Sequence, residues 1–362
     1  MTDSPYLAAL RDRVLVFDGA MGTSVQSYDL TPDDFGGKMG CNDYLPVTRP
    51  DIVEAIHASF LAAGCDVVET DTFGGSRMKL DEYGLGDRTY EINFAAAQIA
   101  RRVADRYSTP EQPRFVAGSM GPTGMLPSSD DPTLSNITFA ALVEMFYEQA
   151  SALIEGGSDL LIIETTQDIL ELKAAIIGVN RYMAASGRRV PVQAQVTLDV
   201  TGRMLLGTDI AAALTTLETL AVDIIGLNCS TGPDHMREPV RYLAEHSSKP
   251  VSCIPNAGLP LNENGLAVYP LLPVPMAETL AEFVNELGVE VIGGCCGTTP
   301  AHIAEMVKRV GGKRRTPRQV ERTPAISSAM RAVELHQVPA PLIVGERVNA
   351  QGSRKVKRLL LA

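Results

Sequence analysis

The chain has 362 residues, a formal net charge of −11 and a hydrophobic fraction of 45%, enough apolar material for one large α/β barrel or two ordinary domains. The acidic balance argues against nucleic acid as a partner, because phosphate binding requires clustered Lys and Arg. The first residues carry both charge signs without an apolar segment, and no apolar run reaches the roughly 18 residues of a membrane span. We therefore expect a cytoplasmic protein with no membrane partner.

Eight short apolar runs predict strands that are buried on both faces, because most of them lack the polar alternation of a half-exposed strand. These runs are residues 14–18, 66–70, 115–119, 159–165, 190–198, 222–229, 250–256 and 289–296. Helical patterns lie between them, such as the four-residue spacing of Ile52, Ile56 and Phe60 after Pro50. Eight β-then-α units are typical of a (β/α)8 TIM barrel. A doubly wound open sheet is disfavoured, since no glycine-rich dinucleotide motif follows the first strand.

The sequence changes character after Gly312. Residues 313–341 carry several prolines and charges with little hydrophobic period, which is typical of an interdomain linker. Residues 342–362 then read as a strand, a polar loop and the first turns of a basic helix. One such unit cannot bury its own apolar face. We therefore predict a barrel over residues 1–312, a linker over 313–341 and, at 342–362, the truncated start of a second barrel.

Three of the six cysteines fall where a barrel carries its active site, at the C-terminal ends of the strands. Cys229 ends the sixth predicted strand, and Cys295 and Cys296 end the eighth. Adjacent cysteines in a regular strand point to opposite faces, so both reach one metal only if the backbone departs from extended geometry. The glycines of the sequence GGCCG supply that freedom. The remaining cysteines are interpreted as core or loop thiols: Cys41, Cys65 and Cys253.

Three thiolates leave the fourth position of tetrahedral zinc open, which is the mark of a catalytic zinc site. Such a soft, electron-rich centre favours sulfur ligands, and coordination deprotonates a thiol whose free pKa is about 8.5. The chemistry implied is alkylation of a thiol substrate. The alternative to a metal site is that the three cysteines are unrelated core residues. A redox pair is disfavoured because adjacent cysteines form a strained disulfide, and a non-catalytic structural zinc would need a fourth protein ligand.

Five segments together resemble the homocysteine-binding barrel of cobalamin-dependent methionine synthases, in the homocysteine S-methyltransferase family. They are residues 18–23 (DGAMGT), 69–76 (ETDTFGGS), 162–168 (IIETTQD), 227–233 (LNCSTGP) and 293–303 (GGCCGTTPAHI), within a match over about 7–311. The tail resembles the start of the folate-binding barrel that follows in those enzymes. The resemblance implies methyl transfer from methylcobalamin, carried by a domain absent from this chain, to zinc-bound homocysteine. Family members that use betaine or S-methylmethionine are the alternative, and they lack the second barrel.

The resemblance also implies roles for individual residues. Cys229, Cys295 and Cys296 are the expected zinc ligands and catalytic centre. Asp18 and Glu164 are expected to hold the substrate ammonium, since a cation in a partly closed barrel mouth needs carboxylate partners. The substrate carboxylate is expected at backbone N–H groups of Gly19, Ala20 and near Thr72. The expected partners are homocysteine and the folate-binding and cobalamin-binding modules of the same enzyme.

Two further observations complete the sequence prediction. Asp71 departs from the family pattern, in which many members carry Asn, and we assign it no ligand role. The five histidines are expected on solvated helix faces, at their approaches or in the linker, and none has metal-ligand spacing with the cysteines: His57, His235, His246, His302 and His336.

Overall fold

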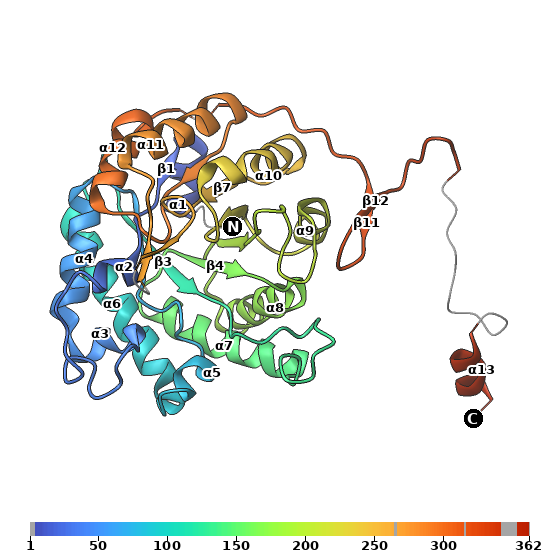
Figure 1. Cartoon of the computed structure of the whole chain (residues 1–362), viewed down its shortest axis with the longest axis horizontal. Coiled ribbons are helices and arrows are strands. Elements are labelled where there is room, and N and C mark those ends of the chain that lie inside the picture. The colour runs from blue at the N-terminus through green and yellow to red at the C-terminus, as the bar shows by residue number, and fades with distance from the viewer. Residues whose placement is uncertain (1–3, 264–265, 315, 342–352, 362) are drawn as a thin grey trace.

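The chain folds as an eight-stranded parallel barrel wrapped by helices, seen almost along its axis in Figure 1. The computed structural model describes residues 4–263, 266–314, 316–341 and 353–361. The strands are β1 (Leu15–Val16), β2 (Val67–Glu69), β3 (Phe115–Met120), β4 (Leu160–Thr166), β5 (Val192–Val196), β6 (Ile224–Asn228), β7 (Val251–Ile254) and β10 (Val291–Ile292). Their order is β1-β10-β7-β6-β5-β4-β3-β2, and a bridge between Phe17 and Val67 closes the ring. The predicted (β/α)8 fold is confirmed.

Helices form the outer layer and cover the apolar outer face of the strands (Figure 1). The larger helices are α4 (Pro50–Ala62), α6 (Thr89–Tyr107), α7 (Phe139–Glu155), α8 (Ile169–Ser186), α9 (Ile210–Leu217), α10 (Pro233–His246), α11 (Pro273–Glu282) and α12 (Pro300–Val310). Several begin as their sequences predict: α4 and α12 carry proline in the first turn, and the Asp168 side chain caps α8 by accepting from the Leu170 N–H. Buried strand and helix side chains form one continuous core between the two layers.

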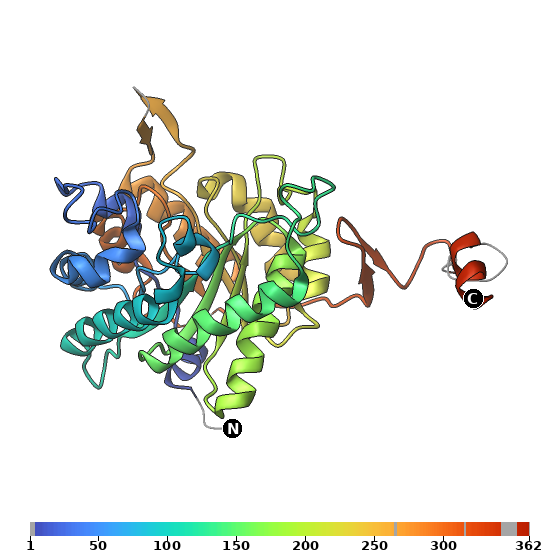
Figure 2. The same ribbon diagram turned by 90° about the horizontal axis from the view of Figure 1, so that it is seen from below.

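Helix α1 (Pro5–Asp12) closes the N-terminal end of the barrel. Tyr6 of this helix is fully buried, packs edge-on against Phe115 and donates a hydrogen bond to Gln193 inside the barrel. Figure 2 shows the N-terminus at one end of the barrel and a projecting hairpin, β8 (Leu261–Glu263) and β9 (Leu266–Val268), at the other. Helix α1 therefore blocks the N-terminal end of the barrel interior. The interior is open to a ligand at the other end, where the strands have their C-termini.

Acidic residues precede alternate strands at the closed end, in a pattern that repeats four times. Each accepts the N–H of the first residues of the preceding strand, at 2.7 to 2.9 Å, and each pairs with an arginine. The pairs are Asp66 with Arg13 and Arg114, Asp159 with Arg101, Asp223 with Arg189, and Glu290 with Arg318. The arginine partners offset part of the desolvation penalty that burial imposes on these carboxylates.

Arg318 comes from the segment that the sequence assigns to the linker, and its side chain packs against the barrel. Its side chain is 6% exposed and lies 3.1 Å from Glu290. It also donates to the backbone carbonyl oxygens of Ala244, Ser247 and Lys249. The barrel thus uses a residue beyond 312, and the first part of the linker is a strap fixed to the barrel rather than a free connection.

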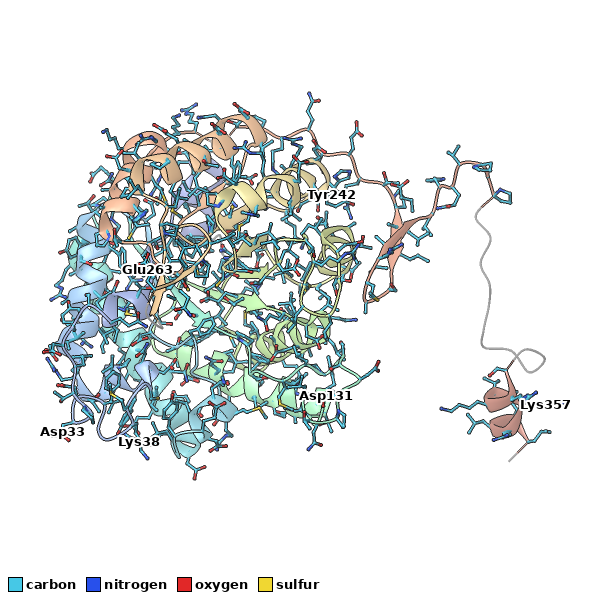
Figure 3. The ribbon with its side chains drawn as sticks, viewed as in Figure 1. Asp33, Lys38, Asp131, Tyr242, Glu263 and Lys357 are labelled. Carbon is cyan, nitrogen blue, oxygen red and sulfur yellow. The ribbon has the colours of Figure 1, made fainter. Side chains whose placement is uncertain are left out.

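The strap, residues 316–335, ends in a hairpin of β11 (Ala325–Ser327) and β12 (Ala332–Glu334), which contacts α9 (Figure 1). Thr208 donates to the Ala329 carbonyl oxygen and the Asp209 N–H donates to that of Met330. Figure 3 labels Tyr242 of α10 on this side of the barrel and Glu263 on the hairpin at the mouth. The sequence predicted neither hairpin, because both are short and mostly exposed.

Residues 353–361 lie apart from the barrel in both views (Figures 1 and 2). Helix α13 (Arg354–Leu360) matches the predicted basic helix, with Ser353 capping its N-terminus by accepting from the Val356 N–H. The strand and loop predicted at 342–352 lie outside the described residues. A search of the described part of the chain finds no helix that is both long and apolar enough to cross a bilayer.

Candidate active site

The side chains of Cys229, Cys295 and Cys296 meet at the barrel mouth. Their sulfur atoms all lie within 4.8 Å of one another, and the Cys295 and Cys296 sulfurs are 4.0 Å apart. Tetrahedral zinc with Zn–S bonds of about 2.3 Å requires sulfur–sulfur separations of about 3.8 Å. The three sulfurs therefore fit a zinc ion with only small adjustments. Their clustering is as expected from the sequence.

An unusual backbone conformation turns Cys229 toward this centre. Cys229 follows β6 and has φ of 61°, and Ser230 has φ of 63°. Left-handed backbone costs a residue with a side chain about 1 kcal/mol or more. Hydrogen bonds from the Cys229 N–H to Ile254 and from the Thr231 N–H back to Cys229 hold the turn. Such strain at a strand end is typical of a functional site.

Cys295 and Cys296 lie after the end of the strand, where the backbone departs from extended geometry as the flanking glycines suggest. Strand β10 ends at Ile292, four residues before Cys296, so the alternation of a regular strand does not apply. The Cys295 N–H donates to the Pro255 carbonyl oxygen, and the Cys296 N–H donates to Oδ1 of Asn256. Gly297 follows with φ of 78°, and a Cβ there would lie 2.3 Å from Tyr269. Both thiols consequently face one centre.

Hydrogen bonds among the three sulfurs make their protonation unequal. Those with Cys229 and Cys295 hold the pKa of Cys296 far below its usual value, whereas those with Cys229 and Cys296 raise the pKa of Cys295. A hydrogen bond from Tyr269 also lowers the pKa of Cys296. Binding of a divalent metal would displace the protons that the thiols of the cluster carry.

Glu164 is the carboxylate that faces the sulfurs across the pocket. It lies near the end of β4, where the register with β5 shifts and Thr165 adopts φ of 55°. Its two oxygens accept hydrogen bonds from the Ser119 hydroxyl, at 2.6 Å, and the Asn228 side-chain amide, at 3.0 Å. Asn228 directly precedes Cys229 and so ties the acidic side of the pocket to the sulfur side. Burial raises the pKa of Glu164 to about 7.

Asp18 lies beside Glu69, a second acid that the sequence interpretation missed. Asp18 is buried next to the pocket rather than in its lining, and its Oδ2 accepts from the Glu69 N–H at 3.1 Å. The Glu69 carboxyl lines the pocket itself. Burial and then the charge of Glu164 raise the pKa of Glu69 well above its usual value. Its position at the end of β2, like Glu164 near the end of β4, was the available sequence signal.

The residues expected to hold a substrate carboxylate lie in different places. Gly19 and Ala20 line the pocket, although the Ala20 N–H already donates to Oγ1 of Thr298. Thr72 is fully buried outside the lining, its N–H donating to Thr70 and its hydroxyl to Ser119. At this turn the pocket is lined by the neighbours of Thr72, namely Thr70, Asp71, Phe73 and Gly74. The cavity measures about 270 Å³, a volume suited to a small amino acid.

Comparison with known proteins assigns this architecture to a family. The family model of homocysteine S-methyltransferases matches residues 15–310. The chain belongs to the homocysteine S-methyltransferase family. The barrel is therefore a methyltransferase, and the match ends at the last residue of α12, before the strap.

Relatives of this methyltransferase extend the similarity through the strap and tail. The chain is 47% identical over 360 residues to the methionine synthase of Mycobacterium tuberculosis and 45% identical over 365 residues to that of Mycobacterium leprae. Both alignments cover 99% of this chain, which spans 30% of the length of either relative.

A solved structure supports the fold of the methyltransferase barrel. The metallated form of the Escherichia coli homocysteine methyltransferase MmuM superposes with a TM-score of 0.66, over 83% of this chain and 97% of that one. The two sequences are 21% identical, so this likeness establishes the shared barrel fold alone.

Two histidines of the methyltransferase are buried, contrary to the sequence interpretation. His57 is fully buried on α4, where burial lowers its pKa to about 4. His302 on α12 is 6% exposed, and its Nε2 contacts the Leu271 carbonyl oxygen at 2.9 Å. Leu271 in turn closes the base of the loop that carries Tyr269, through a hydrogen bond to Ala257. His302 thus supports the loop that packs against Gly297.

Proposed function

We propose that this methyltransferase is the homocysteine-binding module of a cobalamin-dependent methionine synthase. One observation carries the proposal: three sulfurs from β6 and the turn after β10 converge opposite the carboxyls of Glu69 and Glu164. A substrate that carries both a thiol and an ammonium matches these two sides. The high identity to mycobacterial methionine synthases over 99% of the chain favours methylcobalamin as the methyl donor over betaine or S-methylmethionine.

Cys229, Cys295 and Cys296 would hold zinc, which when bound supplies a soft Lewis acid that keeps a substrate thiol deprotonated at neutral pH. Among the described residues, no fourth His, Cys, Asp or Glu joins the three sulfurs. An open coordination position argues for a catalytic rather than a structural metal. The metallated form of MmuM, a protein of the same fold, is consistent with a metal here.

The residues of the chain bind and orient the substrate. Glu164 is held in place by Ser119 and Asn228, so its carboxyl is fixed where it can accept hydrogen bonds from an ammonium. Asp18 lies behind Glu69 and accepts its backbone N–H. The sulfur of a bound homocysteine then points toward the cysteine cluster at the open mouth, where a methyl donor carried by another module can approach.

We further propose that residues 342–362 begin a folate-binding domain and that residues beyond Arg318 connect it to the barrel. Support comes from the alignments, which cover the tail together with the barrel. The cobalamin-binding module and the folate-binding module would then be the partners of this barrel within a longer enzyme.

Proton release tests the proposed function. Homocysteine binding to the zinc-loaded chain at pH 7 should expel close to one proton, because the free thiol is mostly protonated there. Calorimetry in two buffers of different ionisation enthalpy measures this number. Homoserine, which carries a hydroxyl in place of the thiol, should bind poorly and release none. Tight homocysteine binding without proton release would show that its thiol does not reach the metal.

A further inference from the structure

The pocket has an unusual charge balance for an amino-acid site. Four acids line it: Asp43, Glu69, Asp71 and Glu164. Among the described residues, no Lys, Arg or His lines it. The ammonium of homocysteine therefore has several candidate partners, whereas its carboxylate has no cation to meet. A carboxylate taken from water into such a pocket needs hydrogen-bond donors, and only neutral groups can supply them.

Asp71 stands out among the four acids because one of its carboxyl oxygens is buried and has no hydrogen-bond partner. The residue is 5% exposed, and its buried Oδ2 atom accepts and donates no hydrogen bond. Buried polar atoms are nearly always paired, so one that is left open beside a cavity points to a ligand. Glu164, by comparison, has both oxygens occupied.

The turn that carries Asp71 is rigid. Thr70 and Thr72 flank it and join their hydroxyls at 2.6 Å. The Ser119 N–H donates to the Thr70 hydroxyl, and the Thr72 hydroxyl donates to the Ser119 carbonyl oxygen. Both neighbours are thus fixed to β3, and the position of Asp71 at the pocket wall is set by them rather than by contacts of its own side chain.

The surroundings of Asp71 favour its neutral form. The carboxyl of Asp43, in the short 3-10 helix η1 (Asn42–Tyr44), acts on Asp71 electrostatically and uses Oδ1 to accept the Gly74 N–H at 2.7 Å. The buried Cys41 thiol lies on the same side, and Lys79 acts on Asp43. Burial and then the charge of Asp43 raise the pKa of Asp71 well above its usual value. A protonated carboxyl offers one O–H donor.

We propose that Asp71 is a neutral carboxylic acid that donates a hydrogen bond to the carboxylate of the substrate. This inference rests on the proposed function, since it takes homocysteine as the ligand. An ionised Asp71 would repel that carboxylate, whereas a buried acid kept neutral can serve as a donor, as in other enzymes. Asp71 is then a specificity residue that distinguishes an amino acid from a simple aminothiol.

Two ligands separate this role from a structural one. Homocysteine carries the carboxylate, and 3-aminopropane-1-thiol has the same thiol and ammonium without it. In the zinc-loaded chain, Asp71→Ala should weaken homocysteine binding at least tenfold and change binding of the aminothiol less than threefold. Asp71→Asn, which keeps the shape and an N–H donor, should bind homocysteine within threefold of the parent. Equal weakening of both ligands by Asp71→Ala would assign Asp71 a structural role and overturn the proposal.

The number of protons released tests whether the acid is neutral before the substrate arrives. The parent chain and Asp71→Asn should each release close to one proton when homocysteine binds at pH 7, because only the thiol changes protonation. If Asp71 were ionised and took up a proton on binding, the parent would release about one proton fewer than Asp71→Asn, and the proposal would be wrong. Asp71→Asn also keeps the test decisive if the alanine variant fails to fold.

Failure of the proposed function looks different from failure of this inference. If neither thiol ligand binds the zinc-loaded chain, homocysteine is not the substrate, and the role of Asp71 falls with it. If both ligands bind but Asp71→Ala does not distinguish them, the proposed function stands and the inference alone is overturned. Phe73→Leu is a matched control at the same turn, because its side chain lines the pocket without a polar group.

Discussion

The two ends of the barrel treat buried negative charge in opposite ways. At the closed end, Asp66, Asp159, Asp223 and Glu290 each accept a backbone N–H and pair with arginine. At the open end, Asp18, Glu69, Asp71 and Glu164 lie in or beside a pocket whose described lining has no cationic side chain. Arginine compensates the acids of the closed end, whereas the acids of the open end have no cation of the chain in the described pocket lining, and burial raises the pKa of Glu69, Asp71 and Glu164. This division matches the usual separation of stability and function in such barrels.

The largest effect is expected from a substitution that breaks one acid–arginine pair at the closed end and lowers the free energy of unfolding. Arg318→Ala removes the buried arginine that lies 3.1 Å from the Glu290 carboxyl, and we expect the free energy of unfolding to fall by about 3 to 5 kcal/mol. Urea unfolding followed by circular dichroism measures it. Arg322→Ala is the matched control, since this arginine is 61% exposed and 3.6 Å from Glu218, and should cost less than about 1 kcal/mol. Equal effects would mean that the strap is not part of the barrel.

The next effect concerns the sulfur side of the open end. Cys296→Ser should weaken zinc binding at least about 100-fold, or about 2.7 kcal/mol, because the variant loses a ligand rather than an outer contact. It should also lose the proton release on homocysteine binding. Competition with a chromophoric chelator measures the affinity. Cys253→Ser, in the core away from the pocket, should leave zinc affinity unchanged. Full zinc affinity in Cys296→Ser would remove Cys296 from the ligand set.

A smaller effect is expected on the acidic side of the open end. Glu164→Gln keeps the shape of the side chain but removes the charge opposite the ammonium. We expect homocysteine affinity to fall about 30-fold, or about 2 kcal/mol, while zinc stays bound. Asp18→Asn should cost less, because Asp18 lies behind the lining. Calorimetry on zinc-loaded variants gives both values. Loss of zinc together with homocysteine would show that the two sides of the pocket do not act separately.

The sequence predicted the eight strands, the three cysteines and Glu164 because each depends on a local pattern. Apolar runs mark buried strands, and glycines beside Cys295 and Cys296 mark a turn. The sequence did not predict Arg318, since an arginine in a proline-rich segment resembles any linker residue until its partner Glu290 is placed. Asp71 was assigned no ligand role for a different reason, because it departs from the Asn that many family members carry. Its significance lies in the absence of a partner, which only the three-dimensional structure reveals.

The smallest effect is expected at Glu171. It tests whether a buried acid without an arginine partner lowers the free energy of unfolding as pH rises. Glu171 of α8 is 1% exposed and accepts from the N–H and hydroxyl of Thr123, and its Oε2 has no partner. Burial raises its pKa to about 7. A folded-state pKa above the unfolded value means that the folded chain binds more protons. Its stabilising contribution is therefore complete at low pH and is lost as pH rises through about 7.

Glu171→Gln should remove this loss, because the amide can still accept from Thr123 and never ionises. At pH 8 the variant should be more stable than the parent by about 1 kcal/mol, and near pH 4.5 the difference should vanish. Urea unfolding at the two pH values measures both differences. If Glu171→Gln were less stable than the parent at pH 8, the ionised carboxylate would be stabilised by its surroundings. Burial without an arginine would then not be what distinguishes the open end of the barrel from the closed one.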